Sequence, residues 1–82
     1  MRFDQKMMDY ACGEITRTRV INCRKAVEKQ AEAFGGSFTV LQVITLKAML
    51  KTLRGRIIKE KSELLELFDS LFEDIMSFNV TK

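Results

Sequence analysis

The sequence predicts an all-α protein: an antiparallel helical hairpin with one long second helix, dimerising into a four-helix bundle. Apolar residues recur at alternating intervals of three and four between residues 43 and 78, which is typical of a helix in a left-handed supercoil. The chain contains no proline, so no residue forces a helix to stop. Its one clear turn signal is the run Gly-Gly-Ser at residues 35–37. The repeat comprises Val43, Leu46, Leu50, Leu53, Ile57, Leu64, Leu67, Leu71 and Phe78, interrupted at Glu60 and Asp74.

The first helix is expected over about residues 4–34. Asp4 is the predicted N-cap, and Phe3 before it is placed to contact Met8. Gly35 stands where a helix commonly ends in a left-handed residue, so the turn is expected at residues 35–38.

The second helix is expected over about residues 39–77. Thr39 and Gln42 have the spacing of a capping box, and Phe38 before the cap can pack against Val43. A short strand over residues 38–46 is an alternative, because this stretch alternates and is rich in β-branched residues. The sequence offers no second strand to pair with it.

Gly55 lies inside the predicted second helix. A mid-helix glycine costs about 1 kcal/mol relative to alanine. The apolar repeat keeps its phase across this position, which favours one continuous helix. The alternative is a break near Gly55 and a three-helix bundle within the single domain of residues 1–82.

The last part of the second helix is apolar around more than half of its circumference and must be covered on two sides. This excess predicts a homodimer, because two facing helices cannot cover it all. The same face could instead dock on a different protein, as amphipathic helices do in a partner's groove. The candidate interface residues are Leu64, Leu67, Phe68, Leu71, Phe72, Ile75, Met76 and Phe78.

Two charged residues interrupt the apolar faces. Glu60 occupies a position of the repeat, and Arg19 projects from the apolar side of the first helix. Because an unpaired buried charge is very costly, Arg19 and Glu60 are predicted to pair within a subunit or across the dimer. Alternatively, Arg19 extends to solvent and Glu60 lies at a wet edge.

The sequence predicts no enzymatic activity, cofactor or metal. It has no histidine, which is the commonest general base and metal ligand. Cys12 and Cys23 are spaced too far apart on one helix to form a disulfide and are expected in the core as reduced thiols. Reduced thiols are typical of cytoplasmic proteins. The lack of an apolar leader in the first ten residues also favours a cytoplasmic protein.

Charge is unevenly distributed. Residues 37–62 carry six basic residues against Glu60 alone, whereas residues 63–82 carry five acids against Lys82. Basic side chains at seven-residue spacing predict a cationic band across the hairpin, suited to nucleic-acid phosphates. The competing interpretation is an ordinary charged border of the apolar seam. The band consists of Arg17, Arg24, Lys47, Lys51, Arg54 and Lys61.

The predicted function is therefore binding. The preferred class is a protein–protein interaction module: an adaptor, a subunit of an assembly, or an inhibitor, acting through helical packing. The alternative is a dimeric regulator that binds nucleic acid through the basic band. No membrane span is expected, since the longest uncharged run, residues 33–46, is too short.

Overall fold

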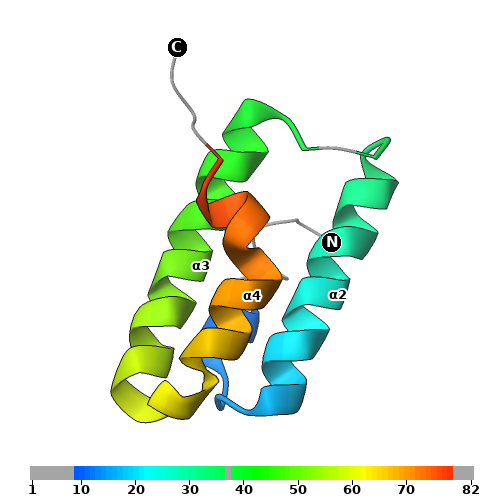
Figure 1. Cartoon of the computed structure of the whole chain (residues 1–82). Helices are drawn as coiled ribbons and strands as arrows, with labels where there is room; N and C mark the ends of the chain where they lie inside the picture. The colour runs from blue at the N-terminus through cyan, green and yellow to red at the C-terminus, as the bar shows by residue number, and fades with distance from the viewer. Residues whose placement is uncertain (1–8, 37, 79–82) are drawn as a thin grey trace.

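The computed structural model describes residues 9–36 and 38–78, and the described part is helical with no strand. Residues 9–12 form a helical turn. They are followed by α2 (Arg17–Ala33), α3 (Val40–Glu60), the 3-10 turn η1 (Ser62–Leu64) and α4 (Leu65–Met76) (Figure 1). The all-α prediction is confirmed. The strand alternative at residues 38–46 is wrong, because α3 is helical from Val40 onward.

The predicted first helix is interrupted. The chain bends at Gly13, and α2 begins only after Thr16, whose side-chain oxygen accepts a hydrogen bond from the Arg19 amide at 3.1 Å. Threonine is a strong N-cap, and glycine weakens a helix interior, so a break here costs little. A Cβ at Gly13 would overlap the Arg19 guanidinium, so a side chain at this position would require Arg19 to move. The predicted Asp4 cap and Phe3–Met8 contact lie outside the described residues.

The turn between α2 and α3 follows the prediction. Gly35 and Gly36 adopt φ angles of 88° and 101°, a region that other residues rarely occupy. The capping box is present: the Gln42 amide donates to Thr39 Oγ1 at 3.2 Å, and the Thr39 amide donates to Gln42 Oε1 at 2.8 Å. Local chemistry therefore sets this boundary.

The predicted second helix is not continuous. It runs through Gly55 without a break and ends at Glu60, after which Lys61 takes an extended φ of −146°. The chain turns through η1 and returns as α4. The prediction of one continuous helix over residues 39–77 is wrong. The alternative, a break near Gly55, is wrong in position, because the helix breaks at Lys61. The turn removes the apolar residues after Leu64 from solvent, which a straight extension of α3 would not do.

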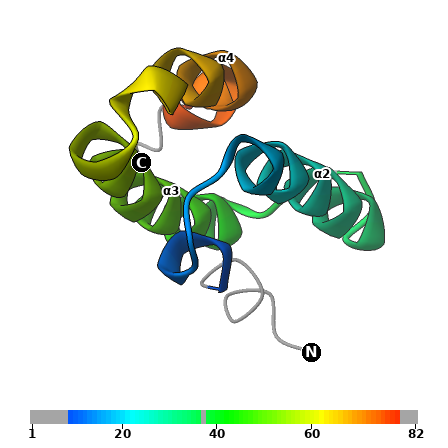
Figure 2. The same ribbon diagram turned by 90° about the horizontal axis from the view of Figure 1, so that it is seen from below.

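The helix α4 packs against the other two helices. α2 and α4 run in the same direction, with α3 opposite to both (Figure 1), and α4 packs against one side of α2 and α3 (Figure 2). The end-on view places residues 9–12 on the face opposite α4 (Figure 2). Completely buried side chains come from α2, α3, α4 and the segment before α2, so one core holds these parts together; the largest are Phe68, Phe72, Ile15, Leu46, Ile57 and Val20.

This arrangement buries most of the apolar surface of α4. The face is covered on two sides, as expected, but by α2 and α3 of the same chain. Phe68 and Phe72 stack at 4.8 Å between ring centroids and are 0% exposed. The surplus therefore gives no argument for a dimer through this face.

Replacing Phe72 with alanine should lower the free energy of unfolding by about 3–5 kcal/mol, because it empties the centre of the core. The matched control is Phe78→Ala, since Phe78 is 45% exposed, and this change should cost about 1 kcal/mol or less. Urea denaturation followed by circular dichroism measures both. Equal losses would contradict the placement of α4 in the core.

Candidate protein-interaction surface

Two arginine–aspartate pairs hold α4 to its neighbours. Arg54 of α3 donates from Nε to Asp69 Oδ1 at 2.8 Å and from Nη2 to Oδ2 at 3.1 Å. Arg24 of α2 donates to both Asp74 oxygens, at 3.1 and 3.3 Å, and to the Leu71 carbonyl at 2.9 Å. Bidentate pairs of this kind fix orientation as well as charge. The two pairs place α4 from opposite sides.

The same pairs lower the pKa of two carboxyl groups. The hydrogen bond from Arg54 lowers the pKa of Asp69, and the hydrogen bond from Arg24 lowers that of Asp74. In both cases, the charged carboxylate is the form that the folded chain favours.

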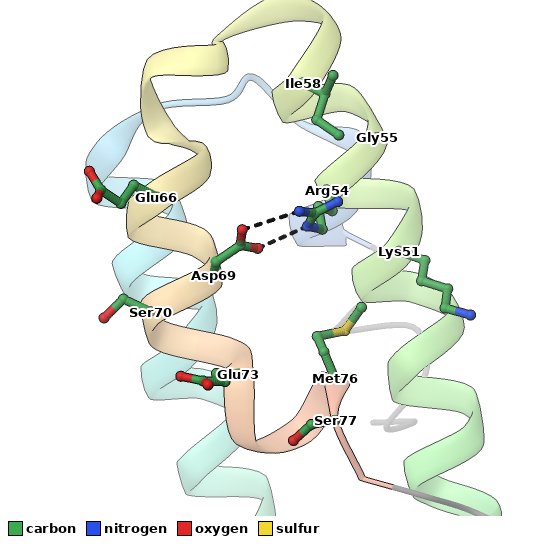
Figure 3. A pocket seen from close by; sticks show the side chains of 10 residues that line it. All are labelled: Lys51, Arg54, Gly55, Ile58, Glu66, Asp69, Ser70, Glu73, Met76 and Ser77. Carbon is green, nitrogen blue, oxygen red and sulfur yellow. Dashed lines mark hydrogen bonds and ion pairs between the residues drawn. The ribbon is translucent and has the colours of Figure 1, made fainter.

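A groove of about 840 Å³ separates the outer edges of α3 and α4. Arg54 and Asp69 point toward one another across it (Figure 3). Glu66 and Glu73 line the α4 side, and neither carboxylate has a hydrogen-bond or ion-pair partner among residues 9–36 and 38–78. Gly55 and Ile58 line the α3 side. The groove therefore combines unpaired acids with an exposed apolar edge of α3.

That edge belongs to a second regular pattern on α3. Six residues recur at intervals of three, four, three, four and three along the helix, on the side opposite the buried seam. Leu41 is 71% exposed, and Ile44 and Ile58 are each 48% exposed. We call this set the outer face of α3: Leu41, Ile44, Ala48, Lys51, Gly55 and Ile58.

Gly55 is the least expected member of the outer face. Its backbone is helical and needs no positive φ. A Cβ there would meet nothing within 4 Å, so this chain's own packing does not require a glycine. Glycine nevertheless costs the helix about 1 kcal/mol relative to alanine.

Sequence analysis missed the outer face because the buried repeat on the same helix is stronger. The signal was present, since Leu41, Ile44 and Ile58 are apolar residues that the buried repeat does not use. Two sets of residues at heptad spacing therefore run along opposite sides of α3, one buried and one exposed.

The predicted interface on α4 is largely used within the chain. Phe68 and Phe72 are fully buried, and Phe78 is exposed. The others are partly buried and packed against the core: Leu64, Leu67, Leu71, Ile75 and Met76. Most of this face is therefore core.

The six residues of the predicted basic band do not come together on one surface of the structure. Arg24 and Arg54 are paired with acids on opposite sides of α4. Lys47 donates from Nζ to the Phe78 carbonyl at 2.8 Å. The remaining members, Arg17, Lys51 and Lys61, are exposed. Because α4 lies between Arg24 and Arg54, they do not form one continuous cationic surface.

Arg19 and Glu60 have separate partners within the chain, so their predicted intrachain pairing is wrong. Arg19 donates to the Asp9 carbonyl at 2.7 Å and lies 5.5 Å from the centroid of the Tyr10 ring. Glu60 pairs with Arg56 at 3.2 Å, one turn away on α3. Pairing between copies stays a prediction.

Arg56, which sequence analysis did not single out, anchors the segment before α2. Its Nη1 donates to the carbonyls of Ala11 and Gly13 at 2.6 and 2.8 Å. With Arg19 on the Asp9 and Tyr10 carbonyls, it satisfies the open end of the short helical turn. Such contacts join distant residues and leave no local sequence pattern.

The cysteines differ in environment. Cys23 is buried as expected, and burial raises the pKa of its thiol to about 11, against the opposing effect of Arg19. Cys12 is exposed, contrary to its expected place in the core. Because its pKa is raised, the buried Cys23 thiol is a poor nucleophile.

No family model, curated protein or solved structure is significantly similar to this chain. The described residues contain no group of three or more histidine, cysteine, aspartate or glutamate side chains placed to hold a metal ion. Among the same residues, no helix has the length and apolar character needed to cross a membrane.

The lowered pKa values of Asp69 and Asp74 give the stability a defined pH dependence. Both lie below the ordinary 3.8 in the folded chain, so the unfolded chain takes up protons first as the pH falls. The stabilisation is present above the unfolded pKa and is lost as the pH falls through the folded values, from about pH 4 downward.

Urea denaturation at about pH 6 and about pH 3 should show this loss. Replacing both Asp69 and Asp74 with asparagine should reduce the difference between the two pH values. Glu73→Gln is the control, because this exposed carboxylate has no partner among the described residues. An unchanged pH dependence in the double variant would show that the two pairs do not stabilise the fold.

Proposed function

We propose that this chain is a non-enzymatic protein–protein interaction module, and that it binds a helix of its partner on the outer face of α3. Such a module can serve as an adaptor, a subunit of an assembly or an inhibitor. The observation that carries the proposal is the line formed by Leu41, Ile44 and Ile58, which are exposed at heptad-compatible spacing. Isolated exposed apolar residues need no explanation, whereas a regular line of them favours a helical neighbour.

The distribution of exposed apolar residues supports this choice of surface. In the described part of the chain, the large exposed apolar side chains are concentrated on α3: Val40, Leu41, Ile44 and Ile58. The outer side of α4 is instead polar, with Glu66, Ser70, Glu73 and Ser77 exposed. A partner helix on α3 would thus have an apolar seam with a polar border, as protein interfaces commonly do.

Nucleic-acid binding remains the competing function. α3 carries five basic residues and one acid, which favours an anionic partner. Against it, Arg24 and Arg54 are already neutralised by aspartates. Salt distinguishes the two functions, because binding to phosphates weakens steeply as salt rises and apolar docking does not.

The direct test is a photo-crosslinking amino acid placed at Ile44 of the full chain in the source cell. Position 44 should give a covalent adduct with a protein, and the adduct should survive nuclease. The control position is Lys29, which is exposed on α2 and should give none. A nuclease-sensitive product, or no adduct at position 44, would contradict the proposal.

Ile58→Asp should weaken the binding of the captured protein at least about tenfold, since a charge at a buried seam costs about 1.4 kcal/mol or more. Ile58 is half-exposed in the free chain, so the thermal unfolding midpoint should change little. Isothermal titration calorimetry with the captured protein measures the loss. Equal affinity for both chains would exclude the outer face as the contact.

A further inference from the structure

We propose that the outer face of α3 binds the same face of a second copy of this chain, with the two α3 helices antiparallel. This inference rests on the proposed function and names the partner. It differs from a dimer through the apolar face of α4, because that face is core. The two-fold axis passes midway along α3, between residues 49 and 50.

The register follows from the heptad positions of the outer face. Leu41, Ala48 and Gly55 occupy one type of seam position, and Ile44, Lys51 and Ile58 occupy the other. In an antiparallel pair, residues of one type face residues of the other. The contacts are then Leu41 with the partner's Ile58, Ile44 with the partner's Gly55, and Ala48 with the partner's Lys51.

Side-chain size agrees with this register. The large Ile44 faces a residue without a side chain, and the long Lys51 faces the small Ala48. A parallel pair would instead set Gly55 and Ala48 against their own copies and leave voids. It would also place Lys51 beside the partner's Lys51, where like charges repel.

Gly55 supports the inference independently. The space where its Cβ would stand is open, and its helical backbone does not need glycine. The position costs the helix stability without serving the isolated chain. The lack of a side chain at Gly55 allows the partner's Ile44 to approach the helix closely.

The charges beside the seam differ between its two sides. On one side, Thr45 comes next to the partner's Lys59, and Thr52 next to the partner's Thr52, so no like charges meet. On the other side, Val40 comes next to the partner's Arg54, which is paired with Asp69, and Lys47 comes next to the partner's Lys47. This pair of like charges opposes the arrangement.

The groove supplies acids on that second side. Glu66 and Glu73 share it with Lys51, Gly55 and Ile58 of the outer face, and neither acid has a partner among the described residues. α3 carries five bases against one acid, whereas α4 carries four acids and no base. In this register, the partner's Leu41 and Ile44 lie opposite Ile58 and Gly55. On the groove side the partner brings Arg54, which is paired with Asp69, and Lys47, whose ammonium has no carboxylate partner among the described residues.

The contact is short and its affinity correspondingly modest. From Leu41 to Ile58 the outer face extends for about 25 Å along the helix. An interface of this length lies at the small end for specific complexes. The dimer should therefore form reversibly, with a dissociation constant in the micromolar range.

The first test is sedimentation equilibrium of the full chain between about 1 μM and about 1 mM. A reversible monomer–dimer equilibrium is expected. Gly55→Leu should weaken it at least about tenfold by filling the space for the partner's Ile44, while leucine, a better helix former, leaves the monomer folded. Phe34→Asp, an exposed apolar position outside α3, is the control and should leave the equilibrium unchanged.

The second test fixes the register by disulfide formation, with Cys12 and Cys23 replaced by serine and alanine. Mixed in equal amounts, an Ala48→Cys chain and a Lys51→Cys chain should form mainly the mixed disulfide. Dimers of each chain with itself would instead show a parallel pair and overturn the proposal.

Different results would contradict self-association and the broader proposal of a protein-interaction module. A chain that stays monomeric at every concentration overturns self-association. If position 44 still crosslinks a different protein, the interaction module stands with another partner. If wild type dimerises and Gly55→Leu dimerises equally well, the contact lies elsewhere and the outer face is excluded.

Discussion

The fold depends on covering the apolar residues that follow Leu64. They occupy so much of the helix circumference that one neighbour leaves part of them in water. The chain turns at Lys61 and sets α4 against α2 and α3, where Phe68 and Phe72 fill the centre of the core. The path of the chain after Glu60 thus follows from burial. No local signal in α3 requires the helix to end there.

Electrostatics then orients what burial brings together. The basic α3 and the acidic α4 are adjacent in sequence and antiparallel in space, so Arg54 meets Asp69 directly. Arg24 reaches α4 from the other side and pairs with Asp74. The uneven charge along the sequence is therefore largely an internal match between neighbouring helices. Glu66 and Glu73, which have no partner among the described residues, remain beside the outer face of α3.

Sequence alone predicted the boundary between α2 and α3, where local chemistry decides, but it missed the equally local break at Gly13 and the Thr16 N-cap. The Thr39 capping box and the glycine turn at residues 35–36 are set by nearby residues and were predicted correctly. The break at Lys61 was missed because the apolar repeat keeps its phase across it, so periodicity cannot distinguish a straight helix from a folded one. The anchoring contacts of Arg56 and the exposure of the outer face depend on distant parts of the chain, and no pattern within a short window records them.

The packing of α4 against the other helices has a consequence for synthesis. α2 and α3 precede α4 along the chain, and α4 packs against both. The apolar sides of α2 and α3 that α4 covers therefore stay exposed until the last described helix leaves the ribosome. A chain that stops short of Phe68 would present those sides to chaperones and proteases. The order of the helices thus leaves completion of the core to the last described helix.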